Sequence, residues 1–246
     1  MISKNQIKFI RQLELKKYRK REGLFVAEGP KVVGDLLKRF KPEAIYATPA
    51  YQGAGETTEI TDDELRRISF LQHPQQVLAL FPIPESHTPE SQIPVLHSQL
   101  SLALDGVQDP GNLGTIIRIA DWFGIETIYC SEETADAYNP KVVQATMGSI
   151  ARVNIIYIKL EELIGTLPPS YPIYGTLLDG NDIYQQQLTE HGLIVMGNEG
   201  NGISEAIRQR VNHRLLIPSF RKGDTAESLN VAIATAITCS EFRRRH

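Results

Sequence analysis

The stretch VMGNEGNGISEAI, residues 195–207, follows an apolar run and leads into a segment with helical character. Its Gly-x-x-Gly-x-Gly spacing is neither the dinucleotide-binding fingerprint nor a phosphate-binding loop, which needs Lys-Ser or Lys-Thr after its last glycine. Glycine permits positive φ and lets a ligand approach bare backbone, and Ser204 is expected to cap the next helix. A tight turn accounts for Gly202 and Ser204, but less well for Gly197 together with Glu199. We therefore interpret this loop as a functional site.

The same alternation of strand, loop and helix continues on both sides of that loop. Apolar runs such as LSLALDGV, TIYCS and RVNIIYI alternate with segments such as LGTIIRIADWF, whose apolar residues recur at helical spacing. Continuous apolar runs are typical of strands in a mostly parallel sheet that is covered on both faces. We predict an α/β, doubly wound domain. Ligands of such sheets bind beyond the carboxyl ends of the strands, so the loops after Leu104, Val195 and Leu216 are the candidate sites.

The first third of the chain alternates helix and strand as well, and it is predicted to be a separate small α/β domain. The segment PIPESHTPESQIP follows it, and four prolines there interrupt polar residues, a composition that holds neither a helix nor a central strand. We place the linker in this segment. The predicted domains are therefore residues 1–94, with the linker at the end, and residues 95–246.

Two further loops carry polar residues at positions suited to a site. In DGVQDPGNLGTIIRIA, Asn112 is expected to cap a helix whose apolar face leaves Arg118 on another side. In IPSFRKGDTAESLNVAIATAI, Ser228 and Asn230 are candidate caps for the last helix. Each of these loops by itself is equally well explained by capping and an ordinary surface cation.

Composition excludes several classes of protein. The net charge of −3 argues against a general nucleic-acid coat, and no apolar run approaches the ~20 residues that span a bilayer. Cys130 and Cys239 are too few for a disulfide framework and have no zinc-site spacing, so no structural metal is expected. The N-terminus lacks the apolar core of a secretory signal. Its basic, amphipathic character leaves organelle targeting open, but the cytoplasm is the expected location.

Positive charge is concentrated at the two ends of the chain. Apolar residues recur at helical spacing from Ile7 to Leu13, and Gly23 ends the basic run, so a single basic helix is predicted there. Such a helix can bind phosphates, whereas the alternative is a solvated helix face. The cations chosen to test phosphate binding are Lys16, Lys17 and Arg19.

Taken in order, the segments NLGTIIR, VMGNEGNGIS and IP…ESLNVAIATAI resemble the motifs of the SpoU (TrmH-type) family of RNA 2′-O-ribose methyltransferases, within the SPOUT superfamily. The resemblance covers residues 100–245, and NPKVVQATMGSIARVNI is similar to the family's segment between its first two motifs. The first third, with RKREGLFVAEGPKVV, resembles the RNA-substrate-binding domain that precedes many of these catalytic domains. The resemblance implies S-adenosyl-L-methionine as cofactor, RNA as partner, a homodimer, and a C-terminal domain folded as an α/β trefoil knot.

The resemblance also implies roles for individual residues. The catalytic residues that it implies are Arg118, Asn112, Glu199, Ser228 and Asn230. The cofactor-binding residues that it implies are Thr176, Met196, Gly197, Gly200, Ile217 and Leu229. The family assigns a central role, sometimes that of general base, to the arginine of the first motif. A guanidinium is effectively always protonated, so binding the target phosphate and stabilising a developing alkoxide is the more economical role for Arg118.

One segment departs from the family pattern, and several interpretations stay open. Between Pro218 and Ser228 the segment SFRKGDTAE is a few residues longer than usual, and Ser219 stands where methionine is common. Ribosomal RNA is the expected substrate, with tRNA as the alternative. A non-catalytic RNA-binding protein of ribosome assembly is the rival from another class, against which the full set of polar motif residues argues. The missing nucleotide-binding motifs argue against a hydrolase or dehydrogenase.

Overall fold

The computed structural model describes residues 2–84, 99–221, 223 and 226–244. The chain divides into two units, one of Met1–Glu85 and Asp136–Arg152, the other of Ser86–Ala135 and Val153–His246. Residues 136–152 therefore belong to the first unit, although the sequence assigns them to the second domain. The predicted linker at 82–94 lies mostly outside the described residues, and the boundary at 94/95 stays a prediction.

The first unit is built around a mixed sheet. Its described strands lie in the order β1 (Leu24–Glu28), β4 (Val77–Pro82), β2 (Ala44–Ala47) and β3 (Thr58–Glu59), with β4 antiparallel to both of its neighbours. Its helices are α1 (Lys4–Gln12), α2 (Lys16–Glu22), α3 (Pro30–Leu37), α4 (Asp62–Ile68), α7 (Pro140–Ala145) and the short 3₁₀ turn η1 (Ser149–Ala151). Helices α1 and α4 cover one face, where Ile10 and Leu65 pack with Leu78. Helix α3 packs on β1 and β4.

The basic N-terminal segment is two helices, so the prediction of a single helix is wrong. Helix α1 begins at a capping box of Ser3 and Gln6 and ends before Leu13, whose side chain is fully buried. Helix α2 ends at Gly23, which has the left-handed φ of 64° that suits glycine at this position. The chain breaks between them because burial of Leu13 turns it inward at the end of α1.

Arg19 is also not the phosphate-binding surface cation that the sequence predicts. Its side chain is 2% exposed and forms an ion pair of 2.6 Å with Asp136. It donates further hydrogen bonds to the carbonyls of Leu13 and Glu14, at 2.7 and 2.6 Å, in the short segment between α1 and α2. Arg19 therefore stabilises the break between the helices and anchors residues 136–152 within the first unit.

The second unit holds a parallel sheet, and the predicted α/β architecture is confirmed. Its described strands lie in the order β10 (His213–Leu216), β8 (Ile173–Asp182), β9 (Gly192–Gly197), β5 (Leu100–Asp105), β6 (Thr127–Cys130) and β7 (Asn154–Tyr157). Every pairing is parallel. The register of β10 on β8 shifts between Arg214 and Leu215.

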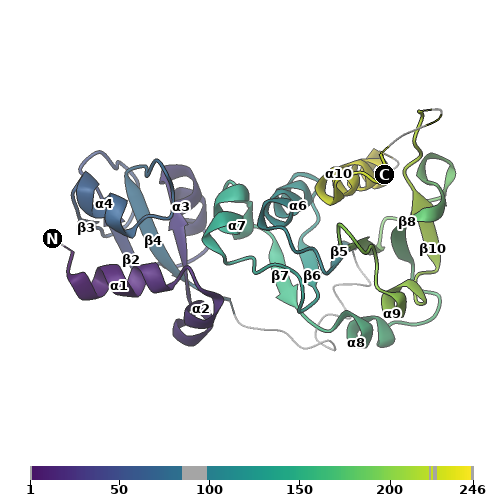
Figure 1. Ribbon diagram of the computed structural model, residues 1–246, viewed down its shortest axis with the longest axis horizontal. Helices are drawn as coiled ribbons and strands as arrows, with labels where there is room; N and C mark the ends of the chain where they lie inside the picture. Colours follow the sequence, from purple (N-terminus) through teal and green to yellow (C-terminus); the bar gives the residue numbers. More distant parts are fainter. Residues whose placement is uncertain (1, 85–98, 222, 224–225, 245–246) are drawn as a thin grey trace. The chain divides into compact units, whose positions relative to one another are not determined.

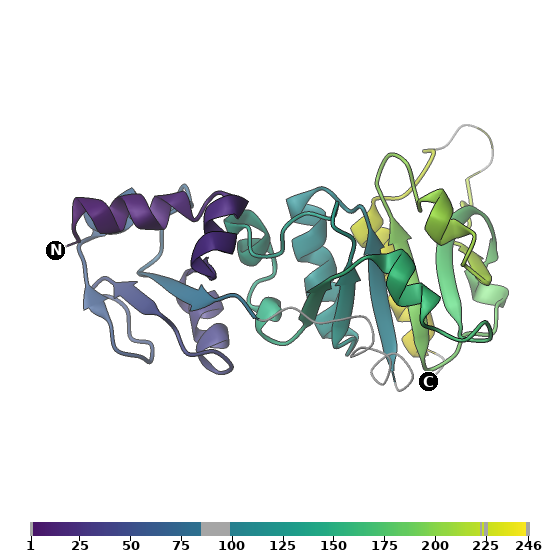
Figure 2. The same cartoon turned by 90° about the horizontal axis from the view of Figure 1, so that it is seen from below.

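Helices cover both faces of this parallel sheet. Helices α6 (Pro110–Trp122) and α10 (Val231–Arg244) pack against each other on one face, and α8 (Leu160–Gly165) and α9 (Glu205–Arg208) lie on the other (Figures 1 and 2). The 3₁₀ turn η2 (Ile183–Gln185) follows β8. Leu163 and Ile207 pack with Val195 in the core on the α8 side. None of the described helices is both long and apolar enough to cross a lipid bilayer.

The order of strands identifies where a ligand would bind. The chain runs outward from β5 through β6 to β7, then crosses to the far side of β5, so β5 lies between β6 and β9. Such a switch point leaves a crevice beyond the carboxyl ends of the central strands. The loops after β5 and β9 therefore meet there, as the sequence predicts.

Candidate active site

The loop after β9 is closed by its own backbone. Asn198 and Gly202 exchange two backbone hydrogen bonds of 2.9 Å, and Gly202 has a φ of 70°. A Cβ on Gly197 would lie 2.3 Å from the carbonyl carbon of Gly202 and from the nitrogen of Ile203, so only glycine fits. Gly197 is thus required for closure of the loop, whereas the sequence suggested that its role was to make room for a ligand.

Asn198 holds this loop in shape, a role that the sequence analysis missed. Its Oδ1 accepts hydrogen bonds from the backbone N–H groups of Gly200 and Asn201, at 2.9 and 3.0 Å. Its Nδ2 donates to the carbonyl of Gly106 in the loop after β5, at 2.7 Å. The Asn-x-Gly spacing after a strand was the available signal, because asparagine side chains often bond to backbone two residues on. Asn198 ties the two loops together.

Polar side chains from all three predicted loops form one hydrogen-bond network. Asn112 donates through Nδ2 to Glu199 Oε1 at 2.9 Å, and Asn230 donates through Nδ2 to Asn112 Oδ1, also at 2.9 Å. The other carboxylate oxygen of Glu199 accepts from the backbone N–H of Gln108 at 3.4 Å. Asn112 and Asn230, 118 positions apart in the chain, are therefore in direct contact beyond the carboxyl ends of the strands.

The helix caps around this network differ in part from those predicted. Asp109, not Asn112, caps α6, accepting the Asn112 backbone N–H at 2.7 Å. That arrangement leaves the Asn112 side chain available to the network. Asn230 does cap α10, since its Oδ1 accepts from the N–H of Ala232 at 3.0 Å. Ser204 makes no side-chain cap of α9; its backbone N–H instead donates to Asp105 at 2.7 Å.

A cavity of about 590 Å³ opens beside the network. All six residues predicted to bind the cofactor line it, namely Thr176, Met196, Gly197, Gly200, Ile217 and Leu229. Glu199 and Ser228 line it as well, with Leu177 and Val231 as further apolar wall. Cavities of roughly 300–1,000 Å³ with apolar walls and a few polar groups are typical of small-molecule sites. The size and lining of this cavity fit S-adenosylmethionine, since apolar side chains suit the adenine and a carboxylate suits the positively charged sulfonium or ammonium group.

Arg118 lies outside the network. It is exposed on α6, six residues beyond Asn112 and therefore about 9 Å further along the helix axis. It has no hydrogen bond or ion pair with any described residue. Ser228 is exposed and reaches the cavity. The lengthened loop at 219–227 includes residues 222, 224 and 225, which lie outside the described residues, and its path stays open.

A second cavity, of about 640 Å³, lies beyond β5, β6 and β9. Acidic side chains dominate its lining, among them Asp105, Glu132 and Glu161. In the described part of the chain, no three His, Cys, Asp or Glu side chains are grouped so as to hold a metal ion.

Cys130 and Cys239 are buried, and burial raises the pKa of both thiols, so neither is a nucleophile at neutral pH.

Comparison with known proteins agrees with this geometry. The chain is 31% identical over 252 residues to the 23S rRNA (guanosine(2553)-2′-O)-methyltransferase RlmP of Bacillus subtilis, covering 98% of this chain and 97% of that protein. Among solved structures, a putative RNA methyltransferase of the TrmH family from Porphyromonas gingivalis matches with a TM-score of 0.91 and 42% identity, over 100% of both chains. An AdoMet-bound rRNA methyltransferase from Sinorhizobium meliloti matches with a TM-score of 0.86 and 31% identity, over 100% of this chain and 97% of that one.

Family models cover both parts of the chain. The model of the MRM3-like substrate binding domain matches residues 4–79, within the first unit. The model of the SpoU rRNA Methylase family matches residues 99–240, which include every residue of the network and the cavity beside it. The chain therefore belongs to the SpoU rRNA methylase family.

Proposed function

We propose that this protein is an S-adenosylmethionine-dependent RNA methyltransferase that methylates a ribose 2′-hydroxyl of ribosomal RNA. The observation that carries the proposal is the network of Asn112, Glu199 and Asn230 at the rim of the 590 Å³ cavity. The names of the Bacillus subtilis and Sinorhizobium meliloti proteins, each about 31% identical to this chain over nearly its whole length, support the reaction, the cofactor and the RNA class.

S-adenosylmethionine would supply a methyl group on a positively charged sulfur, already activated for transfer to oxygen. The remaining difficulty is the 2′-hydroxyl, a weak acid that must lose its proton to be a good nucleophile. Glu199 is held by Asn112 and by the Gln108 N–H, so its carboxylate has a fixed direction at the edge of the cavity. In this proposal the network positions the ribose, and Arg118 binds the adjoining phosphate and stabilises negative charge that develops on the oxygen.

Arg118 needs a second copy of the chain to play this role. Trp122, one helical turn beyond Arg118 on the same side of α6, is 84% exposed, and Ile233 on the adjacent α10 is 52% exposed. Large exposed apolar side chains on two packed helices favour an interface. We propose that two copies pair through this α6–α10 surface, which brings Arg118 of one copy to the cavity of the other.

The dimer proposal is tested by light scattering combined with transfer assays. Trp122→Glu should give a monomer that binds S-adenosylmethionine but transfers no methyl. Arg118→Ala should remain a dimer, bind the cofactor and lose transfer. A Trp122→Glu monomer with full activity would contradict the dimer, and retained turnover in Arg118→Ala would remove that residue from the mechanism.

The trefoil knot and the cytoplasmic location belong to the same proposal. After β10 the chain returns to α10, which packs on α6 and β9 rather than continuing outward. We propose that this C-terminal segment is threaded through an earlier loop, which would hold Ser228 and Asn230 against the other two loops.

The cytoplasm is the proposed compartment, because ribosomal RNA of bacteria is modified there.

Two other functions remain as defined alternatives. A tRNA substrate would leave the cavity and network unchanged, but the names of the Bacillus subtilis and Sinorhizobium meliloti relatives, both of which specify rRNA, favour ribosomal RNA. A non-catalytic ribosome-assembly protein would have no need of the connected Asn112–Glu199–Asn230 network.

The proposal is tested by incubating the protein with labelled S-adenosylmethionine and three acceptors: a 23S ribosomal RNA transcript, large-subunit particles that lack the modification, and tRNA. We expect 2′-O-methyl label at one nucleotide of ribosomal RNA, as transcript or particle. Label in tRNA alone would change the substrate. No label in any acceptor, with the cofactor bound, would support the non-catalytic alternative.

A further inference from the structure

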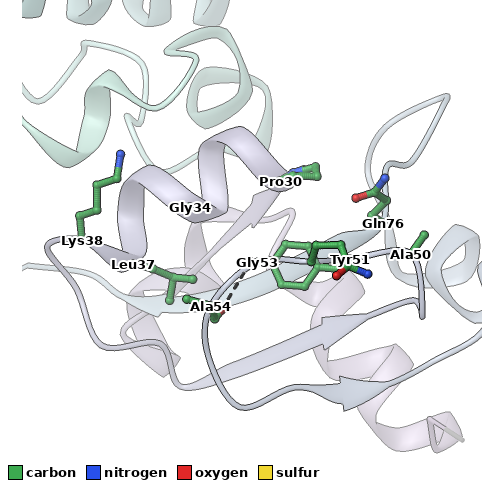
Figure 3. A pocket seen from close by; sticks show the side chains of 10 residues that line it. Pro30, Gly34, Leu37, Lys38, Ala50, Tyr51, Gly53, Ala54 and Gln76 are labelled. Carbon is green, nitrogen blue, oxygen red and sulfur yellow. Dashed lines mark hydrogen bonds between the residues drawn. The ribbon is translucent and has the colours of Figure 1, made fainter.

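A cavity in the first unit lies far along the sequence from the predicted active-site motifs. It has a volume of about 520 Å³ and is bounded by α3 and by residues 50–54 of the loop after β2 (Figure 3). Pro30, Gly34, Leu37 and Lys38 form one side, and Tyr51 and its neighbours form the other. The whole cavity lies within residues 4–79, which match a substrate binding domain.

Gly34 keeps the α3 side of this cavity open. It lies inside α3, where glycine is less stable than alanine by roughly 0.5–1 kcal/mol. A Cβ at this position would meet no atom within 4 Å, and the backbone φ is an ordinary helical one. Neither packing nor conformation therefore requires glycine here. The small residue instead leaves open space beside the helix, which a bound group can occupy.

Tyr51 supplies an aromatic surface to the opposite wall. A Cβ on Gly53 would lie 2.1 Å from the Tyr51 hydroxyl oxygen, so the ring is folded back over the glycine of its own loop. The hydroxyl donates to the carbonyl of Ala54 at 3.5 Å, drawn as a dashed line in Figure 3. The loop thus holds the ring in a defined place beside the cavity.

Two amide side chains complete the lining. Gln52 and Gln76 both border the cavity, and neither side chain has a hydrogen-bond partner among the described residues. Gln76 has a φ of 56°, an uncommon conformation for a residue other than glycine, and its carbonyl accepts the Thr48 N–H at 2.8 Å. Uncommon backbone conformations of this kind occur preferentially at binding sites.

Positive charge gathers next to the cavity. Asp35 lies 2.8 Å from Lys38, 3.4 Å from Lys31 and 3.5 Å from Arg152, so three cations surround one carboxylate. Hydrogen bonding to Lys38, together with the neighbouring cations, lowers the pKa of Asp35, which therefore stays charged. Lys31 and Lys38 alone outnumber this carboxylate, and Lys38 is itself part of the cavity wall.

We propose that this cavity receives one unstacked base of the substrate RNA, with its adjoining phosphate near Lys38. An aromatic ring offers stacking to any base, free amides bond to base edges, and excess positive charge favours the backbone; proteins bind unpaired RNA with this combination of groups. The inference rests on the proposed action on RNA and deepens it, because it gives the first unit a specific contact with an unpaired nucleotide.

The test measures the Kd of the full-length protein for a 23S ribosomal RNA transcript in a pair of matched variants. Gly34→Leu fills the open space from a helix position where the larger residue is tolerated, whereas Gly34→Ala removes the same glycine and leaves most of the cavity. We expect Gly34→Leu to raise Kd about tenfold and Gly34→Ala to change it less than about twofold. Likewise Tyr51→Ala should raise Kd about tenfold, while Tyr51→Phe keeps the ring and the affinity.

A direct readout accompanies these affinities. Ultraviolet crosslinking of the wild-type complex, followed by mass spectrometry, should place a nucleotide on the peptide that contains Tyr51. Wild-type Kd in folded Gly34→Leu and Tyr51→Ala, or tight binding of free GMP or AMP with no effect of either variant on RNA, would overturn the proposal. Absence of methyl transfer by the wild type, with the Kd differences present, would instead count against the proposed function alone.

Discussion

Gly197 and Gly34 show that the same residue can have opposite reasons for being glycine. A Cβ on Gly197 would collide at 2.3 Å with the backbone of its own loop, whereas a Cβ on Gly34 would meet nothing within 4 Å. In the second unit, glycine lets the chain close tightly on itself and so fixes the direction of Glu199. In the first unit, glycine leaves a space unfilled. In the proposed function, methyl transfer needs the fixed loop, whereas binding of a nucleotide of the substrate RNA needs the open space.

The largest expected effect is that of Gly197→Ala. The added methyl must displace the backbone at Gly202 and Ile203, and displacement of catalytic groups by about 1 Å costs about 100-fold in rate. We expect methyl transfer to fall by at least that factor while the Kd for RNA is unchanged. The measurement is single-turnover transfer at saturating RNA, and a rate within about threefold of wild type would show that loop closure is not required.

Glu199→Gln should have the next largest effect. The neutral amide weakens the hydrogen bond from Asn112 and places an N–H₂ near the Gln108 N–H, and hydrogen bonds to charged groups are worth about 1.5–3 kcal/mol. We expect kcat/KM to fall about 10- to 100-fold. Glu205→Gln, an exposed carboxylate on the following helix, is the matched control. Equal loss in both variants would mean that charge near the loop, not the network, is important.

Removal of cations from α2 should act on binding alone. Lys17 and Lys20 are exposed on the same side of this helix, and Lys17→Ala with Lys20→Ala should weaken RNA binding several-fold. The slope of log Kd against log salt should decrease by about one to two, with the transfer rate at saturating RNA unchanged. Arg66→Ala with Arg67→Ala removes two charges from α4 of the same unit. The same change of slope in that control would indicate a general charge effect.

Gly34→Ala should have the smallest effect, and one of opposite sign to Gly197→Ala. Alanine fits the helical backbone with no collision, so the first unit should gain about 0.5–1 kcal/mol in free energy of unfolding. Thermal or urea denaturation measures this gain. A loss of stability would mean that the space beside Gly34 is smaller than the structure gives, and the contrast between the two glycines would fail.

Local patterns in the sequence predicted the elements and the three loops well. The apolar run at residues 192–197 forms β9, and polar residues after β5, β9 and β10 are hydrogen-bonded to one another. Contacts between residues far apart in the sequence were not predicted. Arg19 belongs to the same basic run as Lys17, and only the fold brings Asp136 to it and buries it.

The remaining errors have the same origin. Asn112 and Asp109 both suit a helix cap, and the choice of Asp109 depends on where the chain turns after β5. The need for glycine at position 197 depends on a bridge between Asn198 and Gly202, which no spacing rule expresses. Arg118 was predicted from the family motif, and its position outside the network follows only from its place on α6.

The most direct test of the account is a crystal structure of the protein with bound S-adenosylmethionine. Two cavities lie beyond the carboxyl ends of the described strands of the second unit, of about 590 and 640 Å³, and of these the first is lined by Glu199 of the Asn112–Glu199–Asn230 network. We predict the cofactor in the first, against Gly197, Ile217 and Leu229, with its methyl group directed toward the network. Cofactor in the acidic cavity lined by Asp105 and Glu161 would contradict the account.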